Sequence, residues 1–383
     1  MNQFALTPDQ RVLADSVRRL AAGELATLAA AGVPGQVNRP LVKALGSHGL
    51  LAQVFPDGPV SATRLCLLRE SLAYSCTEAE TALALQGLGG HPIRLGGRPD
   101  AVRRWVPQIA AGEAIAGFAL TEPGAGSDVA ALATEAHEDG GGWRLSGEKT
   151  WISNAPQADV YTIFARTTRQ SGARGITAFA LPADRPGLSG EPLDLLSPHP
   201  IGLLRLDGVP VGPDDVLGEV DAGFAVAMRT LDLFRPSVGA FAVGMTQAAL
   251  DAAVDHAGRR QAFGHPLREL QAVSHQLAEM ATRTEAARLL VYAAAAAYDD
   301  GAADLTVRAA MAKLFATETA QFVVDAAIQI HGAKALQRGH LLEHLYREVR
   351  APRIYEGASE VQRTIIGRGL YRTDRPDRAG ESR

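Results

Sequence analysis

Two long helical stretches joined by a short turn constrain the fold of this chain more than any other feature. Between residues 267 and 298, apolar and small side chains recur every three or four positions, which places them on one face of a helix. Asp299, Asp300 and Gly301 end this stretch, and Asp304 can cap a second helix at about 305–331. Helices joined by so short a loop pack antiparallel, as in a four-helix bundle. The stripe on the first helix comprises Leu270, Val273, Leu277, Met280, Thr284, Ala287 and Val291.

The first hundred residues also predict helices. Thr7 and Gln10 flank Pro8 in the pattern of a capping box, which places the start of a helix there. Further helices are expected at about 40–50, 62–75 and 101–110.

Short β-rich runs alternate with turns from residue 114 to about 217. Strands are predicted near 115–120, 143–146, 160–165 and 176–181, and a domain of antiparallel strands is the simplest interpretation. The expected fold is α+β and mainly helical. It has an N-terminal helical domain (1–113), a middle antiparallel β-domain (114–220), a C-terminal four-helix bundle (221–371) and a disordered tail (372–383).

Composition excludes several classes of protein. The 383 residues carry a formal net charge of −4, which favours neither nucleic acid nor an anionic membrane as partner. Cys66 and Cys76 are too few for a disulfide scaffold or a cysteine-built metal site, so we expect free buried thiols and no metal. No signal peptide is visible, and apolar stretches such as 289–298 fall short of a bilayer span. We expect a soluble, cytoplasmic protein.

Two segments of the predicted β-domain combine glycine, hydroxyl and aromatic side chains. Residues 118–128 form a strand that ends in a Pro-Gly-Ala-Gly-Ser-Asp turn, where glycines allow a ligand to approach the backbone. A plain strand-to-loop turn explains the same letters. In residues 147–155, Trp151 stands between Thr150 and Ser153 and could form one wall of a pocket for a planar ring. Trp151 could equally be an anchor in the core of the sheet.

Two further segments lie in the helical C-terminal part. Arg259 and Arg260 precede a Phe-Gly-His-Pro turn, which suits a phosphate or pyrophosphate, although an arginine pair at a helix end is usually solvated. Glu356 lies in a loop just before a helix for which Ser359 and Gln362 form a capping box. A carboxylate held there in an apolar pocket could act as a general base, whereas an isolated loop glutamate is usually solvent-exposed.

Together the four segments resemble the acyl-CoA dehydrogenase family of flavoproteins over nearly the whole chain, to about Tyr371. The motifs are Thr-Glu-Pro-Gly-Ala-Gly-Ser-Asp, Trp-Ile-Ser-Asn, Arg-x-x-Phe-Gly and Ile-Tyr-Glu-Gly. The resemblance implies FAD bound between the β-domain and the bundle, with its adenine end reaching a neighbouring subunit. No Gly-x-Gly-x-x-Gly follows a predicted strand, so the residues alone do not indicate a Rossmann flavin site.

The family reaction removes an α-proton from an acyl thioester while a β-hydride passes to flavin N5, which gives a trans-2-enoyl thioester. By similarity Glu356 is the base, and its backbone N–H with a ribityl hydroxyl of FAD binds the thioester carbonyl. Hydrogen bonds to that carbonyl stabilise the developing enolate, and a dry pocket strengthens them. Some members carry the base just before a bundle arginine. Phe234 holds that position here, before Arg235, and cannot act as a base.

The resemblance also assigns cofactor and substrate positions. Thr121 and Ser153 match hydroxyls at the flavin ring, with Trp151 nearby, and Arg260 and Gln271 match contacts from the partner subunit. The full cofactor set is Phe118, Leu120, Thr121, Gly126, Ser127, Trp151, Ile152, Ser153, Arg260, Phe263, Gln271, Gln329, Ile330, Gly332, Ala333, Ala358 and Glu360. The substrate set is Ser127, Asp232, Arg235, Tyr355 and Gly357.

Three departures from the family pattern stand out. Ala333 and Ala335 replace two glycines of a Gln-x-x-Gly-Gly-x-Gly motif, which alters the backbone approach to the FAD diphosphate or the partner subunit. Ala358 replaces a threonine near the flavin. His331 can be interpreted as a second acid or base, but packing or hydrogen bonding at a subunit contact is the favoured interpretation.

Several functions share this fold. The leading hypothesis is an FAD-dependent acyl-CoA dehydrogenase of lipid metabolism, a homotetramer or homodimer that passes electrons to an electron-transfer flavoprotein. An acyl-CoA oxidase and a dehydrogenase acting on acyl carrier protein are alternatives. A non-catalytic subunit that binds acyl-CoA is a third, and retention of Glu356, Thr121, Ser153 and Arg260 argues against it.

Overall fold

The described residues of a computed structural model, 6–169 and 172–372, form two compact units. Unit 1 contains residues 6–12, 61–74 and 232–372, and unit 2 contains the described residues of 13–60 and 75–231. The helix α7 (Gly223–Arg259) passes from unit 2 into unit 1. Of the expected tail, residues 373–383 lie outside the described part of the chain, and Arg372 is the last residue of α11 (Ser359–Arg372).

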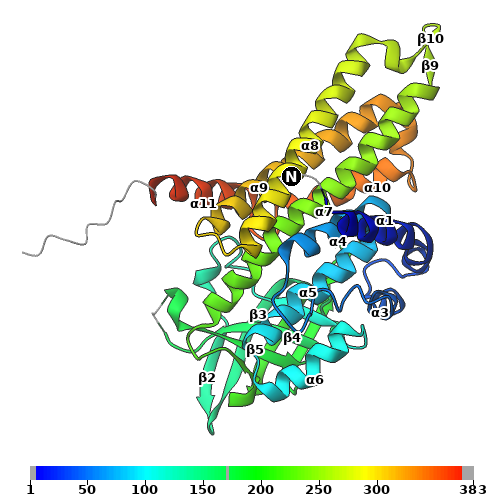
Figure 1. The fold of residues 1–383 in the computed structure, drawn as a ribbon. Helices are drawn as coiled ribbons and strands as arrows, with labels where there is room; N and C mark the ends of the chain where they lie inside the picture. The colour runs from blue at the N-terminus through cyan, green and yellow to red at the C-terminus, as the bar shows by residue number, and fades with distance from the viewer. Residues whose placement is uncertain (1–5, 170–171, 373–383) are drawn as a thin grey trace, which may run out of the picture. The chain divides into compact units, whose positions relative to one another are not determined.

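Unit 1 is helical, as the two long stretches predict. Helix α8 (Gln271–Asp299) packs along α9 (Leu305–His331), and α10 (Leu341–Glu348) and α11 also pack on α9. The α7 and α8 helices are joined at one end by the small hairpin of β9 (Gln261–Ala262) and β10 (His265–Pro266) (Figure 1). On the predicted stripe of α8 the last four residues are buried, and the first three are only half-buried because they lie near the hairpin end. Helix α4 (Ala62–Ser75) completes the unit.

Helix α7 corrects one expectation. It is long and apolar enough to cross a membrane by length and composition, so bilayer-length apolar stretches are not absent from the sequence. The core helix of a soluble protein passes the same test, and 78% of the most apolar window of α7 is buried. In unit 1 the helices α4, α8 and α9 approach α7 closely at Gly239 and Gly244, so this part of the helix is buried on more than one side.

Most of the N-terminal helices lie in unit 2, although the first turns of the first helix belong to unit 1. Thr7 and Gln10 form the predicted capping box at the start of the first helix, with reciprocal side-chain-to-backbone hydrogen bonds of 3.2 and 2.9 Å. Helix α5 lies where no helix was expected. Its two flanking helices were predicted, with boundaries within a few residues. The elements are α1 (Pro8–Leu20), η1 (Ala21–Leu25), α2 (Ala26–Ala30), α3 (Arg39–Ser47), α5 (Thr77–Gly96) and α6 (Pro99–Ala110).

The strands of unit 2 form one sheet with the order β6-β7-β3-β2-β4-β5-β8, and β1 pairs with β4. Most pairs are antiparallel, as expected, but β4 runs parallel to both β1 and β2. These partners are not joined to β4 by hairpins, so the connections do not force an antiparallel arrangement. The strands are β1 (Ala116–Ala119), β2 (Glu135–Asp139), β3 (Gly142–Ser153), β4 (Val160–Arg166), β5 (Ile176–Pro182), β6 (Leu188–Pro192), β7 (Ile201–Val211) and β8 (Val216–Leu217).

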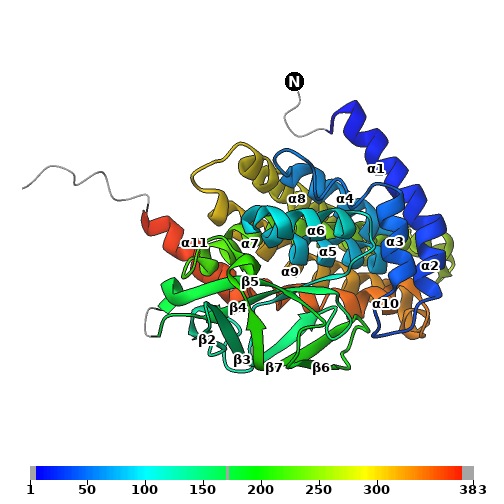
Figure 2. The same ribbon diagram turned by 90° about the horizontal axis from the view of Figure 1, so that it is seen from below.

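The core of unit 2 lies between the sheet and α5, which packs on β1 and β4 (Figure 2). Strands β4 and β5 are buried along almost their entire length, with Phe164 and Phe179 fully enclosed. Both cysteines are free and buried, as expected. Burial raises the pKa of the Cys76 thiol to about 12, so this thiol stays protonated at neutral pH.

The crossing of α4 and α7 generates a stability prediction. A Cβ on Gly244 of α7 would overlap the carbonyl oxygen of Glu70 on α4, whereas a Cβ on Gly258 of the same helix has free space. Gly244→Ala should therefore lower the free energy of unfolding by roughly 1–3 kcal/mol. Gly258→Ala, the matched control, should raise it by up to about 1 kcal/mol through helix propensity. Thermal unfolding of both variants measures this, and equal effects would contradict the close crossing.

Candidate active site

Glu356 lies in a turn with an unusual backbone in unit 1. The turn connects the short helix η7 (Ala351–Arg353) to α11, and its residues Glu356 and Gly357 have φ angles of +52° and +94°. Glycine adopts this left-handed region freely, but a glutamate there costs roughly 1–3 kcal/mol. Such a conformation persists only where surrounding contacts fix it, so the turn is held by its neighbours.

Side chains from three helices hold this turn by its carbonyl groups. Arg235 of α7 donates from Nε to the Glu356 carbonyl over 3.3 Å, and Lys313 of α9 donates from Nζ to the Gly357 carbonyl over 2.7 Å. Gln362 of α11 donates from Nε2 to both carbonyls, over 3.1 and 2.9 Å. Side chains thus satisfy the backbone carbonyl groups of both Glu356 and Gly357.

This arrangement corrects the predicted capping box at the start of α11. Gln362 does not return to the backbone N–H of the cap, because its amide donates instead to the carbonyls of the turn. Ser359 donates its hydroxyl proton to Glu318 Oε1 over 2.6 Å. The polar side chains expected to cap a helix therefore fix the loop that carries Glu356.

One oxygen of the Glu356 carboxyl group is shielded from solvent. The residue is half-buried as a whole, but its Oε2 atom is buried and has no hydrogen-bond partner among the described residues. Burial raises the pKa of the Glu356 carboxyl above its ordinary value, while the charges of Arg69, Lys313 and Arg235 lower it. The solvent-exposed interpretation of Glu356 is therefore wrong, and the group has the setting of a general base.

The expected substrate residues of α7 lie beside this turn. Arg235 is buried, and its Nη1 lies 3.4 Å from Asp232 Oδ1, whose other oxygen accepts from Thr306 Oγ1 over 3.2 Å. Burial raises the pKa of the Asp232 carboxyl against the opposing charge of Arg235. Phe234 is fully buried. Unit 1 thus brings together Asp232, Arg235, Tyr355, Glu356 and Gly357.

Arg69, Lys313 and Gln362 were missing from the predicted site, although the sequence carries a signal for two of them. Lys313 lies on the apolar face of α9, four residues after Ala309 and three before Ala316, both of which are buried. Arg69 occupies the equivalent place between Leu65 and Leu72 on α4. A cation on an otherwise apolar helical face indicates a buried counter-charge.

The two motifs of unit 2 lie side by side. Thr150 N–H donates to the Thr121 carbonyl over 3.0 Å, and Asn154 Nδ2 donates to the Ala116 carbonyl over 2.8 Å. Between them Trp151 has a φ of +58° at a shift in the pairing of β3 with β7. This bulge turns the indole outward, where it is 57% exposed, so Trp151 is not a core anchor.

The other predicted positions of unit 2 follow the same two segments. Thr121, Ser153 and Phe118 are half-buried, Leu120 and Ile152 are buried, and Gly126 and Ser127 are exposed in the turn after β1. The exposed indole with hydroxyls at its sides fits a planar ring that has hydrogen-bonding edges.

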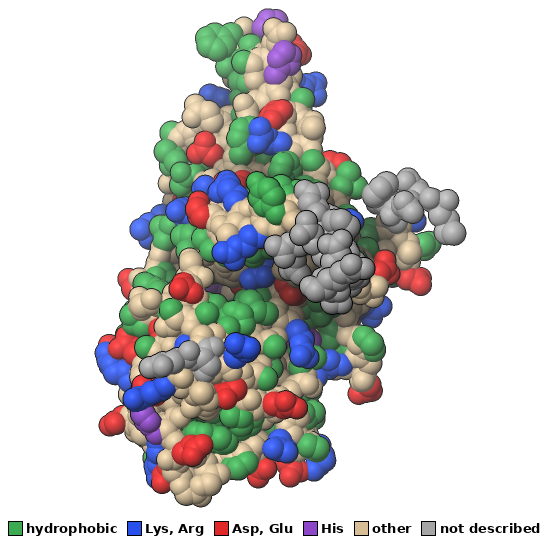
Figure 3. Space-filling view, turned by 90° about the vertical axis from the view of Figure 1, so that its left-hand side faces the viewer, with side chains coloured by type: hydrophobic (Ala, Val, Ile, Leu, Met, Phe, Trp, Pro, Cys, Tyr) green, Lys and Arg blue, Asp and Glu red, His purple; other side chains and the backbone are tan. Residues whose placement is uncertain are grey.

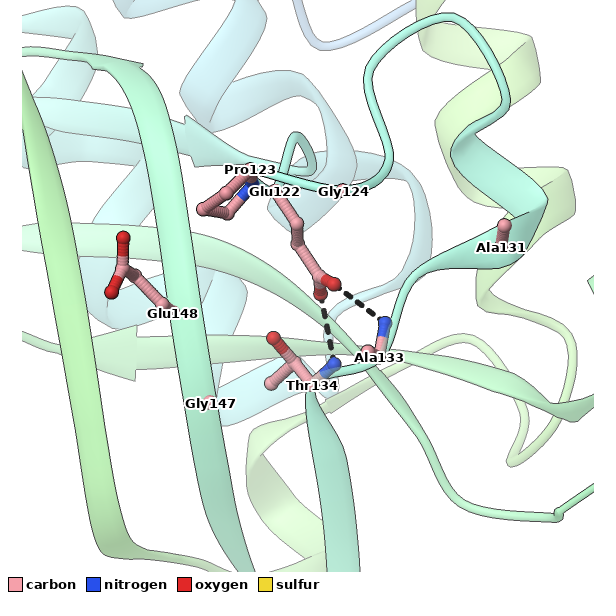
Figure 4. Close-up of a pocket in the computed structure, with 8 residues that line it drawn as sticks. All are labelled: Glu122, Pro123, Gly124, Ala131, Ala133, Thr134, Gly147 and Glu148. Carbon is pink, nitrogen blue, oxygen red and sulfur yellow. Dashed lines mark hydrogen bonds between the residues drawn. The ribbon is translucent and has the colours of Figure 1, made fainter.

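A buried ion pair connects these two segments. Lys149, fully buried in β3, donates from Nζ to Glu122 Oε1 over 2.7 Å and to the Leu120 carbonyl over 3.3 Å. The Glu122 carboxylate also accepts from the backbone N–H groups of Ala133 and Thr134, at the edge of a cavity of about 250 Å³ (Figure 4).

The charge state of this pair follows from these contacts. Burial alone would raise the pKa of the Glu122 carboxyl, but the Lys149 charge and the surrounding hydrogen bonds hold it below its ordinary value. Burial lowers the pKa of Lys149 to about 8 despite the attraction of Glu122. At neutral pH both groups are charged, so the two motifs are tied by an ion pair.

A third group of predicted residues lies at the hairpin end of unit 1. Arg260 is exposed, and Phe263, at the tip of the hairpin, is 87% exposed with a φ of +54°. Figure 3 shows apolar and histidine side chains together at this tip. His331, at the end of α9, stacks on His256 of α7 with ring centroids 4.2 Å apart. The remaining positions there are Gln271, Gln329, Gly332 and Ala333, which are exposed, and Ile330, which is half-buried.

The contacts of His331 within the described chain are packing and a hydrogen bond, and its expected place at a subunit contact stays a prediction. Its Nδ1 lies 2.8 Å from the Ala327 carbonyl, and its ring also contacts His340. Near Glu356, Ala358 is half-buried and Glu360 is exposed. Among the described residues, no group of three or more His, Cys, Asp or Glu side chains is arranged to hold a metal ion.

Sequence profiles of three domains match the chain. They are the acyl-CoA dehydrogenase N-terminal domain over residues 7–113, the middle domain over 117–209 and the C-terminal domain over 221–371. The chain therefore belongs to the acyl-CoA dehydrogenase family of enzymes.

Individual relatives agree with this assignment. Cyclohexane-1-carbonyl-CoA dehydrogenase of Geobacter metallireducens is 34% identical, over 96% of this chain and 99% of its own length. The structure of butyryl-CoA dehydrogenase from Megasphaera elsdenii superposes with a TM-score of 0.90 at 31% identity, over 96% of this chain and 100% of that one. An FAD complex of PigA superposes with a TM-score of 0.89 at 27% identity, over 96% and 99% of the two chains.

The ion pair of unit 2 yields a stability prediction. Lys149→Met leaves the Glu122 carboxylate buried without its counter-charge, which should lower the free energy of unfolding by about 3–5 kcal/mol. Lys43→Met is the control, because Lys43 forms an exposed ion pair with Glu113 over 2.7 Å. Its loss should cost less than about 1 kcal/mol. Denaturant unfolding at pH 7 compares the two variants, and losses of similar size would contradict the role of burial.

Proposed function

We propose that this protein is an FAD-dependent dehydrogenase of an acyl-CoA thioester that forms the trans-2-enoyl product. In this reaction Glu356 removes the α-proton. The observation that carries the proposal is the buried Oε2 atom of Glu356, which has no hydrogen-bond partner among the described residues, in a carboxyl group on which the charges of three cations act. A carboxylate in this state is desolvated and able to accept a proton.

The polar neighbours of Glu356 support this role in different ways. The raised pKa of its carboxyl brings it closer to that of a weakly acidic carbon, which favours proton transfer. The cations keep a fraction of the group ionised in spite of burial. The hydrogen bonds to the turn fix the carboxylate relative to α7, α9 and α11, which limits the motion that would otherwise misplace it.

The FAD contacts that we propose divide between two places. In unit 2 the indole of Trp151 and the hydroxyls of Thr121 and Ser153 would hold the flavin ring. When bound, FAD supplies the acceptor for the hydrogen that leaves the β-carbon with its electron pair.

Arg260 and the residues around Gly332 would hold the diphosphate and adenine of a second subunit's cofactor. About 24 residues of α7 separate Arg235 from the hairpin end, roughly 36 Å at 1.5 Å per residue. The two groups of predicted residues in unit 1 therefore lie far apart along one helix, which supports contact with two cofactors and hence a homodimer or homotetramer.

The alternative functions differ in what reoxidises the flavin or carries the acyl group. A dehydrogenase would pass electrons to an electron-transfer flavoprotein, whereas an oxidase would consume oxygen. A third kind of enzyme would act on an acyl group carried by acyl carrier protein. A non-catalytic binding subunit is disfavoured, because a buried carboxylate oxygen without a hydrogen-bond partner is costly to maintain without a use.

The test is the visible spectrum of the FAD-loaded protein during anaerobic addition of butyryl-CoA and cyclohexane-1-carbonyl-CoA. Loss of the flavin absorbance with either thioester is the expected result. Reoxidation with electron-transfer flavoprotein or with oxygen then separates the dehydrogenase from the oxidase. Absence of reduction by any acyl-CoA, with FAD bound, would refute the proposal in favour of a carrier-bound substrate or a binding subunit.

Glu356→Gln should retain FAD and bind acyl-CoA. Its rate of flavin reduction should fall roughly 10²–10⁴-fold, because the amide cannot accept the proton. Glu285→Gln is the control, since Glu285 is exposed on α8 away from the predicted site. Rapid-mixing absorbance measures both rates. Reduction by Glu356→Gln at the rate of the unmodified protein would show that another group is the base.

Arg260→Ala should weaken retention of FAD more than it slows reduction in the flavin-loaded fraction, because a guanidinium contact to a diphosphate contributes to binding. Arg259→Ala provides the neighbouring control, since Arg259 pairs with Asp255 on its own helix. Flavin remaining after dialysis is the measurement. Equal retention by the two variants would exclude Arg260 as a diphosphate contact.

A further inference from the structure

Lys313 differs from the other side chains that hold the Glu356–Gly357 turn. Gln362 contacts the same Gly357 carbonyl but is neutral. Arg69 affects the charge of Glu356 but lies on α4, where its Nη1 donates to Ser237 Oγ over 2.7 Å. Arg235 also combines a charge that acts on Glu356 with a contact to the turn, but that contact is 3.3 Å long and goes to the carbonyl of Glu356 itself. Among the described residues, Lys313 is the cation that acts on Glu356 and donates to the carbonyl of the next residue, Gly357, at 2.7 Å.

Lys313 is fully buried, so its ammonium group carries a desolvation cost that its contacts must offset. Its side chain has no exposed surface, and three of the four residues that lie three or four positions from it on α9 are alanines. A fully buried ammonium requires both a counter-charge and hydrogen-bond acceptors. Glu356 provides the largest attractive charge on it, and the Gly357 carbonyl provides the acceptor. The ammonium is therefore placed by the loop that carries the base, and it fixes that loop in return.

The charged groups that act on Glu356, or on the cations beside it, come from four helices, α4, α7, α9 and α11. Three are cationic and three are anionic, and the anionic ones each have a cationic or hydroxyl partner of their own. The groups are Arg69 on α4, Arg235 and Asp232 on α7, Lys313 and Glu318 on α9, and Glu360 on α11.

We propose that Lys313 is a positioning residue for the base: its ammonium fixes the Glu356–Gly357 turn through the Gly357 carbonyl and keeps the Glu356 carboxylate ionised. The inference rests on the proposed function, in which Glu356 accepts the α-proton. The two effects are separable, because Gln362 shares the hydrogen bond to the turn but not the charge.

The burial of Glu356 gives the charge effect its direction. Burial raises the pKa of the Glu356 carboxyl, and Lys313 is one of the charges that lower it. Removal of the ammonium must therefore raise that pKa further. Only the ionised carboxylate accepts a proton, so the rate of flavin reduction falls at acid pH. This fall, the acid limb of the pH profile, should move to higher pH.

The experiment compares Lys313→Met with Gln362→Met, both purified as the FAD-loaded full chain. Each substitution removes a buried donor to the Gly357 carbonyl, but only the first removes a charge. The rate of flavin reduction by butyryl-CoA is measured from acid to neutral pH. Lys313→Met should shift the acid limb to higher pH, with a severalfold loss at the pH where the unmodified protein is half-active. Gln362→Met should lower the rate by a similar factor at every pH and leave the limb in place.

A second readout does not depend on turnover. Infrared difference spectra between the protein and its Glu356→Gln variant isolate the band of the protonated Glu356 carboxyl. In the Lys313→Met background that band should persist to higher pH than in the unmodified protein. Lys313→Arg, which retains the charge, should keep the titration of the unmodified protein. If Lys313→Met does not fold, Lys313→Gln, which removes the charge but keeps a donor for the Gly357 carbonyl, should show the same upward shift of the band.

The outcomes separate this inference from the proposed function. If the unmodified protein does not reduce its flavin, the proposed function fails, while the infrared titration still measures the effect of Lys313 on Glu356. If reduction is normal but the band and the acid limb of Lys313→Met coincide with those of the unmodified protein, the inference is overturned and Lys313 is a structural residue.

Discussion

The desolvation of two lysine side chains governs both units of this protein. Lys149 and Lys313 are each fully buried, and burial lowers the pKa of both to about 8. Lys149 is stabilised by the charge of Glu122 and Lys313 chiefly by that of Glu356, and each also donates to a backbone carbonyl in a loop. Because an ammonium cannot stay in an apolar interior without these partners, each loop is fixed by the requirement to satisfy it. The loops concerned are those that the sequence identifies as functional.

The sequence predicted the regular elements well and the supporting contacts poorly. The helices at 62–75 and 305–331 match their predicted limits, because periodicity and end signals agree there. Helix α5 was missed because it is buried on most sides, so it lacks an amphipathic stripe and contains Pro92. The motif residues were identified by resemblance. The pairing of Lys149 with Glu122, and of Lys313 with the turn, connects residues 27 and 44 positions apart, which spacing does not encode.

The polar residues near Glu356 show why capping patterns mislead at functional sites. Ser359 and Gln362 have the spacing of a capping box, and in an ordinary helix they would satisfy their own backbone. Here their side chains are used by Glu318 and by the turn. The start of α11 therefore lacks the hydrogen bonds of a capping box. The loop that carries Glu356 is instead fixed in a backbone conformation that glutamate rarely adopts. Local rules fail most often where the chain carries chemistry.

The lowered pKa of Lys313 has a chemical consequence. An amine that titrates near pH 8 is partly neutral under mildly alkaline conditions, and a neutral amine is a nucleophile that thioesters acylate. In the proposed function this amine would lie beside the base of a protein that binds acyl thioesters. Because the side chain has no exposed surface and its ammonium is bound to the Gly357 carbonyl, the burial that makes the amine reactive also denies it to the thioester.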